Sequence, residues 1–172
     1  GVKYAERYGF EYVVLMDADG QHNPQDISVL LDILKNDKAD FVIGSRFSEE
    51  NIYQEGISRK LGRAFFSFLI YCLSGAKIKD PTSGFQAFNR KTQKIYSSEL
   101  FPIDYPDADV LLLFAYHNLR IKEVPVKMNT TSGKSMHSGI RSALYYIYKM
   151  LLSMLIVLSY KKEIKRKAQN GY

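Results

Sequence analysis

Residues 12–21 read Tyr-Val-Val-Leu-Met-Asp-Ala-Asp-Gly-Gln, an apolar run that ends in two carboxylates. The run 12–16 is typical of a buried strand in a parallel sheet. Ligands of open α/β sheets bind beyond the carboxyl ends of the strands, where Asp17 and Asp19 lie. Two such carboxylates repel each other unless a cation is close, and Mg²⁺ is often bound by carboxylates together with substrate phosphates. The stretch therefore predicts a site for a metal ion and a diphosphate, with a solvated acidic turn as the alternative.

Composition is that of one folded domain with a hydrophobic core, since 46% of the 172 residues are hydrophobic and 24% are charged. The formal net charge of +6 favours anionic partners such as phosphates or an anionic membrane surface. Nucleic acid is not favoured, because the basic residues are not interleaved with an aromatic stacking platform. A single cysteine, Cys72, excludes an internal disulfide and suits a reducing compartment. Its apolar helical surroundings predict a core position.

Hydrophobic periodicity predicts an α/β fold in which strands alternate with helices. Further strands are expected over residues 39–44, 85–89 and, as an edge strand, 121–128. Helices are expected to end near residue 10, to start at Asn23-Pro24, and to span residues 58–73, 91–99 and 110–118.

The C-terminal segment, residues 141–172, is distinct from the α/β domain over residues 1–140. Residues 145–160 are nearly all apolar or aromatic, and a basic run follows them. The apolar run is shorter than the ~20 residues that span a bilayer. An apolar helix with a basic flank is typical of an interfacial helix on an anionic membrane. A core or dimer helix with a solvated charged end is the alternative.

Five motifs now occur in order along the chain. They are Asp17-Ala-Asp-Gly-Gln-His-Asn-Pro24, Gly44-Ser-Arg-Phe47, Arg59-Lys-Leu61, Asp80-Pro-Thr-Ser-Gly-Phe85 and Glu123-Val-Pro-Val126. With them the chain resembles family 2 glycosyltransferases, most closely the dolichol-phosphate mannosyltransferase and polyprenyl-phosphate glycosyltransferase branch. The resemblance implies a partial GT-A, Rossmann-like fold with a mixed, mostly parallel sheet flanked by helices. It also implies that the family's first strand and nucleotide-base-binding segment would precede Gly1, so inactivity of the chain alone is one expected outcome.

The resemblance implies roles for particular residues. Asp17 and Asp19, as an Asp-x-Asp motif, would bind Mg²⁺ or Mn²⁺ and the sugar-nucleotide diphosphate, with Gln21 near the metal. The substrate-binding residues it implies are Arg46, Arg59 and Arg63 for the acceptor phosphate, Asp80, Ser83 and Gly84 beside the donor sugar, and Lys134, Ser135 and His137 in a loop over the diphosphate. The arginine that the family usually carries in that loop is missing.

The expected reaction is a metal-dependent, inverting transfer of a hexose from a nucleotide-sugar donor. The acceptor would be a polyprenyl phosphate or a glycan, reached from the cytoplasm at the inner face of the membrane, in the biosynthesis of a cell-envelope glycan. A hydroxyl acceptor needs a general base, for which Asp107 and Asp109 are candidates, although Asp is also a good helix cap. A lipid phosphate is already ionised and needs none. His22 is expected to be a surface residue rather than a ligand.

Two other classes remain as alternatives. A haloacid dehalogenase-type phosphohydrolase also has a strand that ends Asp-x-Asp-Gly. It needs Thr or Val where Gln21 stands, and a later acid pair after an apolar strand, which Asp107 and Asp109 do not provide. The other class is a non-catalytic, membrane-associated remnant or binding module.

Overall fold

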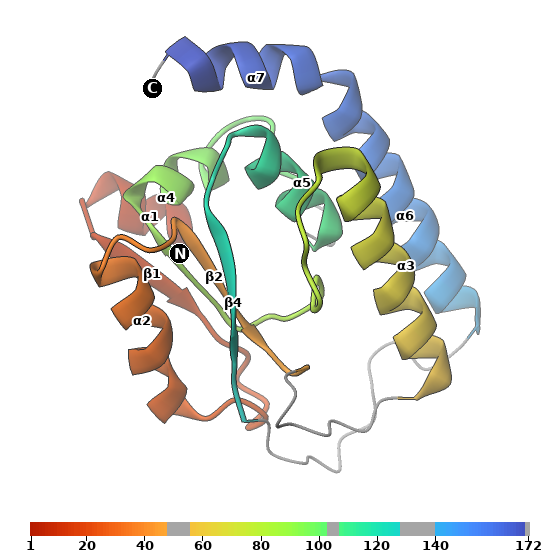
Figure 1. The fold of residues 1–172 in the computed structure, drawn as a ribbon, viewed down its shortest axis with the longest axis horizontal. Coiled ribbons are helices and arrows are strands. Elements are labelled where there is room, and N and C mark those ends of the chain that lie inside the picture. The colour runs from red at the N-terminus through yellow and green to blue at the C-terminus, as the bar shows by residue number, and fades with distance from the viewer. Residues whose placement is uncertain (48–55, 103–106, 128–139, 171–172) are drawn as a thin grey trace.

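The computed structural model describes residues 1–47, 56–102, 107–127 and 140–170. Figure 1 shows one sheet with helices on both faces. The strands are β1 (Tyr12–Leu15), β2 (Phe41–Ser45), β3 (Gln86–Asn89) and β4 (Ile121–Pro125). The helices are α1 (Val2–Arg7), the 3₁₀ turn η1 (Pro24–Asp26), α2 (Ile27–Lys35), α3 (Ile57–Ser74), α4 (Arg90–Tyr96), α5 (Ala108–Tyr116), α6 (Ile140–Ser159) and α7 (Lys161–Asn170).

The strand order is β1-β3-β2-β4. β3 runs antiparallel to both of its neighbours, whereas β2 and β4 are parallel. Three strands therefore share one direction, which confirms the mixed sheet implied by the resemblance. The predicted strand at residues 12–16 is present as β1, but the prediction that it is buried and paired in parallel is wrong. β1 is half-buried and pairs with antiparallel β3, because it lies at an edge of the described sheet.

The two faces of the sheet are covered by different helices. Alternation along β2 sends Phe41 into one cluster, with α3, α5 and α6, and Val42 into the other, with Leu30 and Leu34 of α2. All five residues of β2 are buried. This two-sided burial explains why the strand reads as a continuous apolar run.

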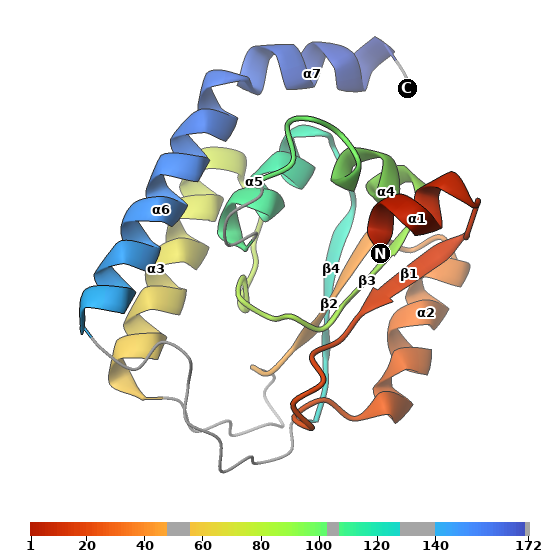
Figure 2. The same ribbon diagram turned by 180° about the vertical axis from the view of Figure 1, so that it is seen from behind.

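α5 is the central helix of the larger cluster. Eight of its nine residues are buried, because both α3 and α6 pack against it. Figure 2 shows α3 and α6 on the same flank of the molecule, and a contact between the rings of Phe66 and Tyr146 joins them. Helices that are apolar on all sides are usually buried, yet α3 and α6 also carry exposed apolar side chains.

The ends of the helices follow the sequence signals. Asn23 caps η1 by accepting a hydrogen bond from the Gln25 N–H, and Gly75 ends α3 with φ +79°.

The predicted core position of Cys72 is wrong, because its thiol lies on the exposed face of α3. Among the helices of the described ranges, none is both long enough and apolar enough to cross a membrane.

Candidate functional site

The acidic turn after β1 meets the loop that precedes β3. The Asp17 side chain is 62% exposed, and the backbone of Gly84 lies against its carboxylate. A β-carbon at residue 84 would overlap this carboxylate, so any other residue here would require the Asp17 side chain to move. Two residues that the sequence placed in different motifs therefore form one site.

The rest of the acidic turn is also ordered by its own residues. Gly20 has φ +80°, and the Gln21 N–H donates to Asp19 Oδ1 over 2.9 Å. The chain then turns inward, so His22 is only 7% exposed and packs on the Phe85 ring. Its Nε2 lies 3.5 Å from Asp17 Oδ2. The prediction that His22 is a surface residue is wrong, because Phe85 provides an apolar wall for its ring.

The donor set of this turn fits a hard divalent cation in part. Asp17 and Asp19 are exposed carboxylates that follow a strand directly. Within the described ranges, no group of three or more His, Cys, Asp or Glu side chains could enclose a metal ion. A cation here would take its other oxygen ligands from water and substrate phosphates, as Mg²⁺ commonly does. Gln21 contributes by bracing Asp19 through its backbone.

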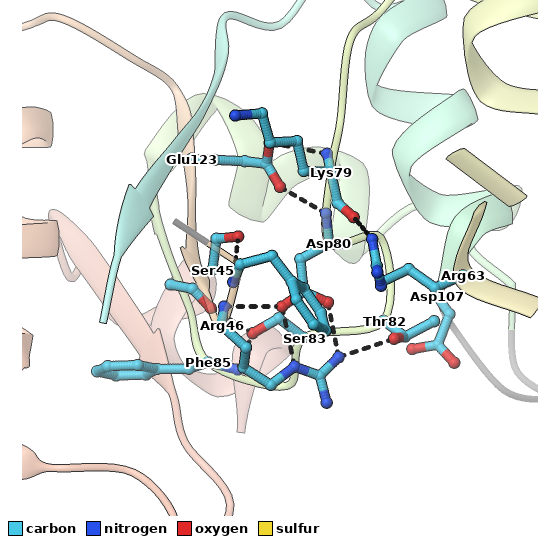
Figure 3. A network of polar contacts seen from close by, with 12 residues as sticks. Ser45, Arg46, Arg63, Lys79, Asp80, Thr82, Ser83, Phe85, Asp107 and Glu123 are labelled. Atoms are coloured by element: carbon cyan, nitrogen blue, oxygen red, sulfur yellow. Dashed lines mark hydrogen bonds and ion pairs between the residues drawn. The ribbon is translucent and has the colours of Figure 1, made fainter. Parts of the chain in front are cut away.

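Arg46 and Asp80 form the centre of a second group, shown in Figure 3. The Arg46 guanidinium donates to both carboxylate oxygens of Asp80, over 2.6 and 2.9 Å, and its backbone N–H donates as well. Asp80 is fully buried, whereas the Arg46 side chain is 20% exposed. The same guanidinium donates to Thr82 Oγ1. Such a bidentate pair fixes the arginine at the end of β2.

Residues of β4 and β2 hold the loop 79–84 in place. Glu123 accepts hydrogen bonds from the Lys79 and Asp80 N–H groups, over 2.8 and 2.7 Å. Burial raises the pKa of Glu123, against the effect of these two bonds. Ser83 Oγ donates to the Gly44 carbonyl over 2.6 Å. Asp80 and Ser83 thus anchor the loop that brings Gly84 to the acidic turn.

The other predicted arginines come from α3. Arg63 donates to the Lys79 carbonyl over 3.1 Å and covers the Phe47 ring at 3.7 Å. It therefore lies close to the Arg46–Asp80 pair, and two cations are brought to one corner. Arg59 belongs to α3, but its side chain is outside the described residues. The predicted positions of Lys134, Ser135 and His137 lie outside them too.

The two candidate bases differ in their surroundings. Figure 3 places Asp107 on the same side of the network as Thr82 and Arg63, and its carboxylate accepts from the Tyr146 hydroxyl over 2.6 Å. Asp109 is fully buried, and it accepts from Ser153 Oγ and from two backbone N–H groups. Burial raises the pKa of Asp109 to about 6. Asp109 therefore joins α5 to α6 through Ser153.

Comparison with known proteins gives the family. Residues 1–95 match the model of glycosyl transferase family 2. The chain belongs to glycosyl transferase family 2. It is 30% identical over 155 residues to the UDP-N-acetylglucosamine–dolichyl-phosphate N-acetylglucosaminyltransferase of Methanococcus voltae, covering 88% of this chain and 62% of that protein. It is 30% identical over 157 residues to the polyprenol monophosphomannose synthase of Mycolicibacterium smegmatis, covering 86% and 57%.

A third relative is the dolichyl-phosphate beta-glucosyltransferase of Saccharomyces cerevisiae, 25% identical over 185 residues, which cover 94% of this chain and 54% of that protein. The chain spans less than two thirds of the length of these relatives. Membership of this family confirms the resemblance seen in the motifs and leaves the phosphohydrolase alternative without support.

Some residues of the site were not assigned a role from the sequence. Glu123 stood in a quoted motif, but its contact with the 79–84 loop depends on the pairing of β4 with β2. Thr82 lies in the motif Asp80-Pro-Thr-Ser-Gly-Phe85, and its place two residues after Asp80 could have indicated that it belongs to the site. Tyr146 and Ser153 lie in the apolar segment, where nothing in the sequence indicates that they bind Asp107 and Asp109.

Proposed function

We propose that this chain carries the donor and acceptor-phosphate residues of an inverting, metal-dependent glycosyltransferase that uses a polyprenyl phosphate acceptor. The observation that carries the proposal is that the acidic turn and the Arg46–Asp80 group meet at the carboxyl ends of β1 and β2. The acidic turn contacts Gly84, and the loop that ends in Gly84 also holds Asp80 and Arg46. The loop 79–84 therefore joins the arginine corner proposed to bind an anion to the carboxylate pair of the acidic turn.

The donor end is the acidic turn. Asp17 and Asp19 would hold Mg²⁺ or Mn²⁺, which would balance the charge of the departing nucleoside diphosphate. Gln21 and Gly20 keep the turn in shape, through the Gln21 N–H and the positive φ of the glycine. We assign the donor sugar to the space beside Gly84, since this residue lies directly against Asp17.

The acceptor end is the corner formed by Arg46 and Arg63, with Arg59 as a further candidate. An oxygen of the acceptor phosphate would attack the anomeric carbon, and the bond from that carbon to the diphosphate would break on the opposite side. The electron pair leaves with the nucleoside diphosphate, and the configuration inverts. Arginine suits phosphate because its donors form a planar fork.

A phosphate acceptor is favoured over a glycan hydroxyl. A hydroxyl would need a base within hydrogen-bond reach. Asp109 is fully buried, and Asp107 is hydrogen-bonded to Tyr146. The named relatives are dolichyl- or polyprenyl-phosphate enzymes as well. In this proposal Asp107 positions the acceptor corner, and Asp109 supports Asp107.

Donor binding can be measured by calorimetric titration of the chain with UDP-sugars and GDP-sugars, with and without Mn²⁺. The Asp19→Asn variant is expected to lose metal-dependent binding, whereas Asp32→Asn, on the exposed side of α2, keeps it. Saturable binding that ignores both Mn²⁺ and Asp19 contradicts the metal assignment. No binding of any donor by the wild-type chain favours the non-catalytic alternative.

We also propose that α6 lies on an anionic membrane surface, at the cytoplasmic side. Tyr148 and Leu155 of α6 are each 61% exposed, and the basic helix α7 follows. Deleting the whole segment is not a clean test, because Met150 and Met154 are buried in the core. The double substitution Tyr148→Glu and Leu155→Glu keeps the core intact.

Flotation with phosphatidylglycerol vesicles measures this contact. The wild-type chain is expected to float, and the double variant to lose at least about five-fold in the bound fraction. Val29→Glu, which replaces an apolar side chain that is 44% exposed on α2, is the matched control. A wild-type chain that stays at the bottom of the gradient contradicts the proposal.

A further inference from the structure

A cavity of about 520 Å³ lies between the loop at residues 99–102, α5, α6 and the start of α7. Its walls are mostly apolar side chains, among them Leu100, Phe101, Leu152, Ile156, Val157 and Ile164. Cavities of this size and character hold small apolar ligands in other proteins. A nucleotide diphosphate is a poor match, since it would need several cations or N–H donors.

Polar groups occur at only a few points of this wall. Glu99, Lys149 and Ser153 line the cavity, and Ser153 is hydrogen-bonded to the buried Asp109. These polar side chains come from the loop 99–102 and from α6, and apolar side chains form most of the remaining wall. A ligand that fills this cavity is mainly hydrocarbon.

The cavity is connected to the candidate site through α6. Tyr146 contacts Asp107 next to the acceptor corner, and Lys149 lines the cavity one helical turn later. Figure 1 shows α6 running along the flank of the molecule, beside α3, toward α7. From residue 146 to Ile156 the helix rises about 15 Å. One turn of α6 therefore separates the Tyr146–Asp107 contact from the first residue of α6 that lines the cavity.

The surface beyond the cavity has the same character. Leu152 and Ile156 line the cavity and are still 41% and 54% exposed, so their other sides face outward. Leu155, which does not line the cavity, is 61% exposed. An apolar chain that enters the cavity can thus continue over apolar surface.

We propose that this cavity binds the isoprenoid chain of the acceptor, while the acceptor phosphate lies at the Arg46 and Arg63 corner. The inference rests on the proposed function and adds a binding site for the lipid part of the substrate. It follows from three observations together: the apolar wall, the position of Lys149 one helical turn after Tyr146, and the course of the cavity along α6. The chemical class of the ligand is a prenyl or polyprenyl chain that ends in a phosphate.

The first experiment places a fluorescent reporter in the cavity. The chain contains no tryptophan, so Leu152→Trp adds a single, unique one. Titration with farnesyl phosphate is expected to shift its emission saturably to shorter wavelength, since the lipid displaces water from the indole. Farnesol should give a weaker shift of the same kind, and inorganic phosphate none. Tyr8→Trp, on an exposed residue beside α1, is the matched control and should not respond.

The second experiment measures affinity without a reporter. Ile156→Asp, which puts a charge into the cavity wall, is expected to weaken farnesyl phosphate binding at least ten-fold by equilibrium dialysis. Val29→Asp, at an exposed apolar position on α2 outside the cavity, should leave it within two-fold. Equal loss or no loss in both variants overturns the inference.

The outcomes separate this inference from the proposed function. One result is that farnesyl phosphate binds the wild-type chain, but its addition leaves the emission of the Leu152→Trp variant unchanged and Ile156→Asp does not weaken its binding. This result overturns the cavity assignment and keeps the acceptor class. Absence of any farnesyl phosphate binding overturns it as well. Failure of the metal-dependent nucleotide-sugar titration instead removes the proposed function, whatever the lipid does.

Discussion

Asp109→Asn provides a test of how α5 and α6 are joined. In the native chain the Asp109 carboxylate accepts hydrogen bonds from the Val110 N–H over 2.8 Å, the Asp107 N–H over 3.0 Å, and Ser153 Oγ. An asparagine has nearly the same shape. Its carbonyl can accept the two backbone bonds, and its amide can donate to Ser153. The substitution therefore removes the charge and keeps the contacts.

The expected magnitude follows from the pKa. Burial raises the pKa of Asp109 from 3.8 to about 6. Between these two values the native state binds more protons than the unfolded state, so the free energy of unfolding falls as the pH rises. The loss is complete above pH ~6 and amounts to about 3 kcal/mol. Asparagine does not titrate and does not incur this loss.

We expect Asp109→Asn to be more stable than the wild-type chain by up to about 3 kcal/mol at pH 7 and about equal to it at pH 4. Urea denaturation followed by circular dichroism at pH 4, 5, 6 and 7 measures the difference. Asp32→Asn on α2, an exposed carboxylate, controls for the change in net charge. A difference that does not grow between pH 4 and pH 7, or a variant less stable at pH 7, refutes the reasoning.

Three further predictions concern the loop and the sheet. Gly84→Ala is expected to keep the fold and to weaken Mn²⁺-dependent donor binding more than ten-fold in calorimetry, because its β-carbon would displace the Asp17 carboxylate from its present position; unchanged affinity would contradict a role for this contact in donor binding. Asp80→Asn is expected to cost about 3 kcal/mol in urea denaturation, because Arg46 loses a buried anionic partner; a loss below about 1 kcal/mol would contradict the buried-pair argument. Arg120→Ala is expected to cost about 2 kcal/mol at pH 7. Burial favours protonation of Asp40, but hydrogen bonds from Arg120 outweigh this effect and lower the pKa of Asp40 to about 2. The difference in the free energy of unfolding between the variant and the wild-type chain should therefore fade as the pH drops from about 4 toward 2. A difference that does not depend on pH would contradict this reasoning.

Local sequence patterns predicted most of the secondary structure. The helix over Ile57–Ser74 ends at Gly75, as its apolar run and glycine indicate. Strand β2 was visible because it is buried on both faces. Partners were harder to predict, since the antiparallel insertion of β3 between β1 and β2 depends on contacts far apart in the chain.

Local sequence patterns also did not predict the burial of single side chains. His22 looks like a surface residue in the sequence, yet Phe85, from a distant part of the chain, covers its ring. Cys72 looks like a core residue, yet it lies on the outward face of a helix that is apolar on both sides. In both positions exposure depends on whether another element packs over the side chain.

The sequence by itself determined the family, because a strand followed by Asp17 and Asp19, and the loop from Asp80 to Gly84, are local patterns. Only the tertiary structure decided that Gly84 touches Asp17, that Glu123 holds the loop, and that Asp109 is buried against Ser153. The physical reason is that a dihedral preference or an apolar period acts within a few residues. Burial and hydrogen-bond partners depend instead on which distant segments the packed core brings into contact.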